Sequence, residues 1–238
     1  IPAKNRLADF PHYLMHRAEQ LDNLYIFKNT EGTPENIRKF HPNIIVSSTG
    51  SAPLLPPIAG LKDRIDNENH NIYSILGMIS HINDFPKDLK GKKVVVVGGG
   101  AVGLDVVEFF ADRNADISIV EMMDQIGRDL DPVSKNDTKT MMKKHNVHQL
   151  TKTALLEVKD SSFLVRGEGE PYELPFEYGF VCLGMRAQGQ LYQNLTEEFS
   201  SEDVEIMNIG DSQRARRIID GTQEGRNILT ILEQKGYL

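Results

Sequence analysis

The chain has 238 residues, of which 39% are hydrophobic and 26% are charged, and its formal net charge is −7. This composition is that of a folded protein, and the length suits one large domain or two smaller ones. The acidic balance argues against a nucleic-acid partner, because such proteins present a basic face. No apolar run reaches membrane-spanning length and no signal-peptide pattern opens the sequence, so a cytoplasmic location and no membrane partner are expected.

Neither a disulfide framework nor a metal site is expected. Cys182 is the only cysteine and lies in an apolar run, which favours a small buried side chain over a reactive thiol. His12 and His16 share a face of a predicted helix, but no third ligand is evident, so they are interpreted as surface residues.

The first 60 residues are predicted to alternate helices and strands. Apolar spacing predicts a helix over 5–21, a strand over 24–27, a small helix from residue 33 or 34 to residue 40, and a buried strand over 44–46. A run of small residues that includes Thr49 and Gly50 ends this strand, and a proline-rich connection follows it. Ser74 is expected to cap a helix over residues 75–83.

The most informative stretch is residues 92–103, which reads as strand, tight turn and helix. Four consecutive valines, 94–97, indicate a central parallel strand covered by helices on both faces. In the turn that follows, Gly98 allows the tight bend, Gly100 leaves room for a pyrophosphate, and Gly103 lets the helix pack close to the strand. The free N–H groups of this helix start, which includes Gly99, Ala101 and Val102, would face an anion.

A lone glycine motif is weak, but this one has its full context. Residues 117–120 predict a second strand, and Glu121 ends it about 20 residues after the glycines, where an acid that binds the adenosine ribose of NADH belongs. The alternative is an ordinary glycine turn with Glu121 merely solvated.

The remaining chain is predicted to add an antiparallel meander and to return to the parallel sheet. The predicted elements are a helix from about 132, strands over 153–158, 163–166 and 172–174, strands over 180–184 and 204–209, and a last helix over 218–234. The expected fold class is therefore α/β, with a Rossmann-like parallel sheet and an antiparallel meander.

The pattern resembles the flavoproteins that contain two dinucleotide-binding domains. The resemblance rests on Thr49–Gly50, the 98–103 fingerprint, the strand ending at Gly184, and Gly210–Asp211 before the final helix. More narrowly, residues 1–4, 214–220 and 224–225 look like the C-terminal half of the 2-enoate reductase and 2,4-dienoyl-CoA reductase group.

The resemblance implies how the chain is divided between two cofactors. It implies an NAD(H)-binding domain over 64–203, inserted in a FAD-type Rossmann-like domain formed by 1–63 and 204–238. Thr49–Gly50 would mark the crossover, Asp211 would contact the flavin, and Asp105 would lie near the nicotinamide, or be a solvated helix residue. Such enzymes also carry an N-terminal barrel with a flavin and an iron–sulfur cluster.

Two departures from the family pattern matter. No second glycine fingerprint occurs in the chain, so the flavin domain is expected to be incomplete and the chain to be a piece of a longer enzyme. The usual Gly-x-x-Pro is here Gly184-Met185-Arg186-Ala187, which leaves this loop undefined.

The sequence thus predicts the NADH-binding electron-input module of a flavin-dependent oxidoreductase, with NADH and, in the intact enzyme, FAD as cofactors. No catalytic side chain is assigned, because the cofactors supply the chemistry. A non-catalytic NAD-binding sensor and a disulfide-reductase-like flavoprotein stay open as alternatives, as does a homo-oligomer.

Overall fold

The computed structural model describes residues 2–237. The chain forms two compact units, which we call the first and the second unit. The first unit comprises Ile1–Tyr13 and Pro53–Gly184, and the second comprises Leu14–Ala52 and Met185–Leu238. The chain therefore passes three times between the units, at residues 13–14, 52–53 and 184–185.

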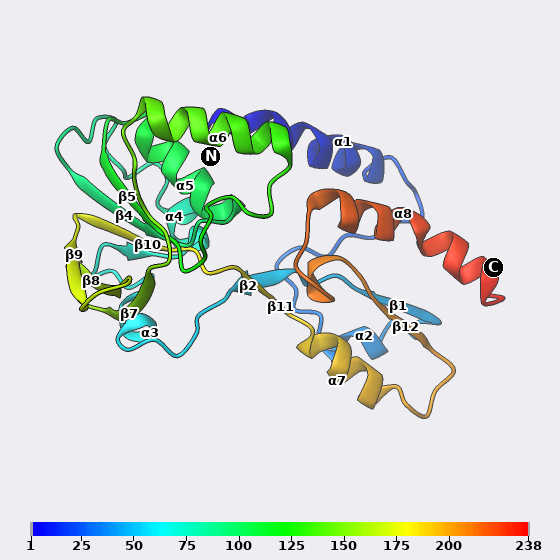
Figure 1. Cartoon of the computed structure of the whole chain (residues 1–238). Coiled ribbons are helices and arrows are strands. Elements are labelled where there is room, and N and C mark those ends of the chain that lie inside the picture. Colours follow the sequence, from blue (N-terminus) through cyan, green and yellow to red (C-terminus); the bar gives the residue numbers. More distant parts are fainter. Residues whose placement is uncertain (1, 238) are drawn as a thin grey trace. The chain divides into compact units, whose positions relative to one another are not determined.

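The first unit is built on a five-stranded parallel sheet of order β3-β10-β4-β5-β6. The strands are β3 (Ile72–Tyr73), β10 (Tyr178–Val181), β4 (Lys93–Val97), β5 (Asp116–Val120) and β6 (His148–Leu150). The helices of this unit are α3 (Leu61–Arg64), α4 (Ile75–Ser80), α5 (Ala101–Ala111) and α6 (Pro132–Lys144). As predicted, the fold is α/β with a Rossmann-like parallel sheet (Figure 1).

The central strand β4 is buried on both faces, as its four valines predicted. Val94 and Val96 point into a core shared with α4, α5 and α6, whereas Val95 and Val97 point into a second core on the opposite face. Helices α4, α5 and α6 cover the first face, and the second face receives only the short helix α3 through Leu61. The second face is covered mainly by an antiparallel sheet, so the expectation of helices on both faces was wrong.

That antiparallel sheet is the predicted meander, with strands β7 (Ala154–Val158), β8 (Ser162–Arg166) and β9 (Tyr172–Pro175). Its buried Phe163 and Val165 alternate with outward residues and provide the apolar cover. Gly179 of β10 makes this packing possible, because a Cβ there would lie 2.7 Å from the Phe163 ring.

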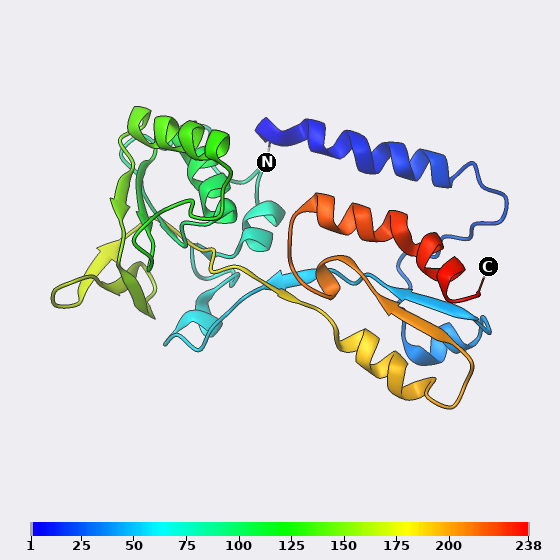
Figure 2. The ribbon, with the colours of Figure 1, turned by 45° about the vertical axis from the view of Figure 1, so that its right-hand side comes forward.

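The second unit contains two parallel strands, β1 (Ile44–Ser47) and β12 (Glu205–Asn208). Helices α2 (Pro34–Arg38) and α7 (Gln190–Glu198) lie on one side of this pair, and α8 (Ile218–Gln234) lies on the other (Figures 1 and 2). A small core joins Ile45 of β1 to Leu195 and Phe199 at the α7 end. β2 (Ser51–Pro53) and β11 (Met185–Ala187) form a separate two-stranded sheet, so the loop after Gly184 that the sequence left undefined is a short strand.

The boundaries of the units differ from positions 64 and 203 for a packing reason. Leu61 of α3 is fully buried in the core beneath the meander, which places residues 53–63 in the first unit. Leu195 of α7 is fully buried against β1, which places residues 185–203 in the second unit. The sequence had predicted neither α3 nor α7.

Near the N-terminus one expectation holds with shifted bounds and another was wrong. The helix expected over 5–21 is a 3-10 segment, η1 (Pro2–Ala8), followed by α1 (Asp9–Ala18), and no residue of α1 is buried, so its apolar stripe has no partner in the described chain. Residues 24–27 form no strand: no described strand pairs with them, and their side chains are 44–77% exposed.

The described residues include no helix with the length and apolar character needed to cross a membrane.

Candidate functional site

The predicted glycine turn is present, and two of its glycines are required by close approach. Gly98 has φ +109°, and a Cβ there would lie 2.1 Å from the carbonyl oxygen of Cys182 on the neighbouring strand. A Cβ on Gly103 would lie 1.9 Å from the carbonyl oxygen of Gly98. Any side chain at either position would therefore separate β4 from β10 or α5 from the turn.

Gly100 differs from these two because it faces open space. A Cβ at this position would meet no described atom within 4 Å, although Gly100 is the N-cap of α5. No side chain caps α5, so its first N–H groups remain free to bind an anion. This arrangement fits a pyrophosphate lying directly on the backbone at the helix start.

Glu121 follows β5 and is held in place by the glycine turn. Its Oε2 accepts a hydrogen bond from the N–H of Gly99 at 2.6 Å, and its Oε1 accepts one from the N–H of Met123 at 2.7 Å. Both oxygens retain free lone pairs, since each carboxylate oxygen can accept two bonds. The carboxylate is therefore fixed in position and can still accept hydrogen bonds from ribose hydroxyls.

The turn and Glu121 border a cavity of about 620 Å³, a size typical of small-ligand sites. Six predicted site residues line it: Gly98, Gly100, Ala101, Val102, Glu121 and Gly184. The sequence reasoning missed the others, which are Leu54, Pro56, Ile58, Val97, Val120, Met122, Asp129, Thr153, Ala154, Leu155, Cys182 and Leu183. Most of these lie within the predicted strands or in the proline-rich connection, so their position near the strand ends was the available signal.

Three predicted residues of the first unit do not line the cavity. Gly99 and Gly103 lie behind it, where they support Glu121 and the packing of α5. Asp105 forms an ion pair with Lys4, which also lies 3.5 Å from Glu108, and these residues border a different hollow between α5 and α6.

Cys182 behaves as the small buried residue that the sequence predicted. It is 7% exposed at the base of the cavity, and burial raises the pKa of its thiol to about 12. The thiol is therefore protonated at neutral pH and is a poor nucleophile.

The second unit brings the remaining predicted residues together at the carboxyl ends of β1 and β12. Thr49 donates its hydroxyl to the carbonyl oxygen of Gln188 at 2.6 Å, and Gly50 has φ +75°. The carboxylate of Asp211 accepts hydrogen bonds from the Ser51 hydroxyl at 3.2 Å and from the Arg216 N–H at 3.1 Å.

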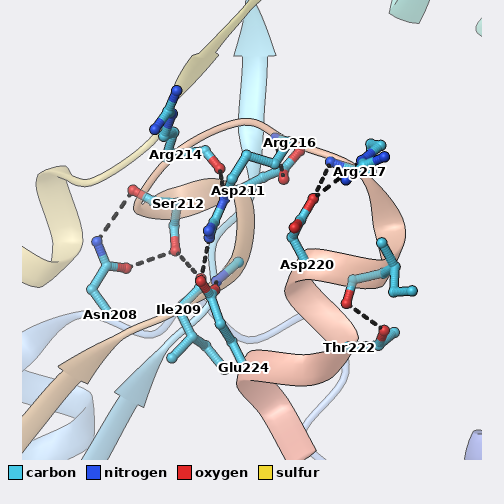
Figure 3. A network of polar contacts seen from close by, with 12 residues as sticks. Asn208, Ile209, Asp211, Ser212, Arg214, Arg216, Arg217, Asp220, Thr222 and Glu224 are labelled. Carbon is cyan, nitrogen blue, oxygen red and sulfur yellow. Dashed lines mark hydrogen bonds and ion pairs between the residues drawn. The ribbon is translucent and has the colours of Figure 1, made fainter. Parts of the chain in front are cut away.

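A polar network ties this turn to α8 (Figure 3). Gly210, at φ +66°, donates its N–H to Oε2 of Glu224 at 2.6 Å, and the guanidinium of Arg216 pairs with Oε1 of Glu224. The Gly210 N–H, followed by Arg216, holds the pKa of Glu224 below its usual value. The Ser212 hydroxyl, 2.7 Å from Oδ1 of Asn208, closes the turn on the strand side. The turn that carries Asp211 is thus rigidly positioned.

A glycine turn after a buried parallel strand, a free helix start and a carboxylate after the next strand define a dinucleotide-binding α/β protein. The family model described as pyridine nucleotide-disulphide oxidoreductase matches residues 17–207, and the chain belongs to this family. Its cofactors are NAD(H) and FAD, and the glycine turn fits the first of them.

Named relatives are oxidoreductases. The chain is 26% identical to a metal reductase of Desulforamulus reducens, over 92% of this chain and 36% of the relative. It is also 26% identical to an NADH oxidase of Thermoanaerobacter brockii, over 80% of this chain and 28% of the relative. The structure of a 2-naphthoyl-CoA reductase complex with 2-naphthoyl-CoA aligns with a TM-score of 0.68 and 22% identity, over 83% of this chain and 28% of that one. The chain thus spans about a third of its curated relatives.

Proposed function

We propose that the chain is the NADH-binding electron-input module of a flavin-dependent oxidoreductase that reduces an activated alkene, such as an enoate or a dienoyl-CoA. The observation that carries the nucleotide assignment is the turn itself, in which Gly98 and Gly103 have no room for a side chain while Gly100 faces open space. The open space at Gly100 lets a ligand lie close to the backbone. A turn with only a structural role does not need this space.

The residues of the first unit then have separate roles. The N–H groups at the start of α5 would bind the pyrophosphate, and Glu121 would accept hydrogen bonds from the adenosine ribose hydroxyls. Gly184, at φ +107°, borders the same cavity and lets the chain leave β10 without a side chain in the ligand's path. When bound, NADH supplies a hydride and FAD accepts it.

The flavin is assigned to the second unit together with protein outside this chain. Thr49, Gly50, Gly210 and Asp211 would face the flavin nucleotide, but the chain has no second glycine fingerprint to hold its pyrophosphate. We therefore assign the rest of the flavin site, and the N-terminal barrel with its iron–sulfur cluster, to a longer parent enzyme. The partial coverage of the relatives supports this assignment.

The substrate class rests on the narrower sequence resemblance of residues 1–4 and 214–220 to enoate and dienoyl-CoA reductases. Disulfide reduction is less well supported, because the only cysteine is buried and its thiol stays protonated. A non-catalytic NAD sensor would share the nucleotide site but would not need the Asp211 turn of the second unit.

The experiment is a visible absorption spectrum of the purified chain, followed by NADH titration and an NADH oxidation assay with and without added FAD. We expect a colourless protein that binds NADH and does not oxidise it. A yellow protein that turns over NADH would show that the flavin site is complete in this chain. Failure to bind NADH would contradict the nucleotide assignment.

A further inference from the structure

The loop between β5 and α6 places a second carboxylate at the nucleotide cavity. Asp129 lines the cavity together with Glu121, the residue that directly follows β5. Among the described residues that line the cavity there is no lysine, arginine or histidine. Arg128, the nearest cation in sequence to Asp129, is exposed and does not line it.

The loop is fixed to the glycine turn at Gly127, and a second backbone bond closes the loop around Asp129. The N–H of Gly127 donates to the carbonyl oxygen of Gly99 at 2.7 Å, and the N–H of Leu130 donates to that of Gly127 at 3.1 Å. Asp129 lies between these two anchored residues, so its backbone is held at a set place beside the cavity. An anion in the cavity would therefore meet this carboxylate wherever the loop keeps these bonds.

The two carboxylates differ in how their charge is compensated. The oxygens of Glu121 each accept a backbone N–H, which reduces the field that they project into the cavity. Asp129 takes part in no side-chain hydrogen bond or ion pair with any described residue from 2 to 237. Its charge is weakened only by solvent.

We propose that Asp129 is a specificity residue that excludes the 2′-phosphate of NADPH, in addition to Glu121. This inference rests on the proposed NADH-binding function. A 2′-phosphate would bring up to two negative charges into a cavity that is lined by the carboxylates of Glu121 and Asp129 and by no cation. A free 2′-hydroxyl carries no such penalty.

The test is Asp129→Asn in the full chain, with NADH and NADPH titrated separately by calorimetry. The substitution keeps the size of the side chain and removes its charge. We expect NADPH affinity to rise about five- to thirtyfold, and NADH affinity to rise much less, because NADH lacks the 2′-phosphate. The gain should shrink near 1 M salt, where the Debye length falls to about 3 Å. A packing effect of the substitution would not show this salt dependence.

Asp124→Asn is the matched control. Asp124 is an exposed residue on the same loop that does not line the cavity, and its substitution changes the net charge equally. We expect this variant to leave the ratio of NADPH to NADH affinity within about twofold of the original chain's ratio.

Several results would overturn the inference. One is a ratio of NADPH to NADH affinity in Asp129→Asn that equals the ratio in the unmodified chain. Another is a change of this ratio in Asp124→Asn that is as large as the change in Asp129→Asn. In both cases NADH binding itself would still support the proposed function. Equal binding of both nucleotides by the unmodified chain would also overturn it. If the unmodified chain bound neither nucleotide, the proposed function would fail together with the inference.

Discussion

At the scale of single residues, Glu121 has a structural role and a proposed binding role. Its carboxylate braces the turn through the N–H groups of Gly99 and Met123, and in the proposed complex it also binds the ribose. Replacing Glu121 by Ala removes both contributions, whereas Gln keeps the shape and one of the two acceptor oxygens.

We expect Glu121→Ala to weaken NADH binding about tenfold or more, since hydrogen bonds to a charged group contribute about 1.5–3 kcal/mol. Glu121→Gln should weaken it less. Calorimetric titration of both variants measures this order. An alanine variant that binds NADH as tightly as the unmodified chain would contradict the ribose assignment.

Replacement by alanine should have different effects at Gly103 and at Gly100, two glycines of the turn. Gly103→Ala forces a Cβ against the Gly98 carbonyl, at 1.9 Å before relaxation, so we expect a loss of about 1–3 kcal/mol of stability. Gly100→Ala meets no described atom within 4 Å and should fold normally, yet it should weaken NADH binding by filling the space beside the backbone. Thermal unfolding of both variants measures the difference in stability, and nucleotide titration measures the difference in NADH affinity. A stable Gly103→Ala variant would show that α5 can shift away from β4.

At the scale of elements, the junction of β12 with α8 depends on an ionised glutamate. The pKa of Glu224 is lowered in the folded protein, mainly by the Gly210 N–H and then by Arg216. A group with a lowered folded pKa stabilises the fold above its unfolded pKa, near 4.3, and this contribution is lost as pH falls through the folded pKa.

We therefore expect part of the stability of the second unit to be lost below about pH 4.3 in the unmodified chain. Glu224→Gln should lower its unfolding temperature at pH 7 and should flatten this acid limb. Unfolding temperatures measured from pH 7 down to pH 3 test the expectation. The same acid limb in both proteins would mean that other carboxylates cause it.

At the scale of the whole molecule, the two units have separate cores. Two sets of buried side chains flank β4, one on each face, and a third set joins Ile45 to Leu195 and Phe199. Each unit can therefore unfold in its own transition.

We expect two calorimetric unfolding transitions. NADH should raise the unfolding temperature of the first unit only. Saturation at about 100 times the Kd would add about 2.7 kcal/mol to that unit. Gly103→Ala identifies the transition of the first unit, because this substitution should lower its unfolding temperature. A single transition that moves as a whole would show instead that the two units unfold cooperatively.

The local signals predicted much of the first unit. The valine run, the 98–103 glycines and Glu121 predicted the central strand, the turn and the acid after the next strand, because each depends on contacts within a short βαβ segment. The last helix was predicted to span 218–234, and α8 has these bounds, since its apolar spacing is a property of the helix alone.

Tertiary structure decided what depends on contacts between distant segments. The sequence around Leu61 and around Leu195 does not indicate to which unit each segment belongs. Leu61 is buried against the meander and Leu195 against β1, and this burial assigns each segment to its unit. The meander covers most of one face of the sheet in place of helices, and its Phe163 ring packs against Gly179, where a Cβ would lie 2.7 Å from the ring. Likewise, the sequence alone could not distinguish Arg128 from Asp129 as the residue that borders the cavity. The position of this loop depends on the bond from the N–H of Gly127 to the carbonyl oxygen of Gly99, which joins segments that are distant in the sequence.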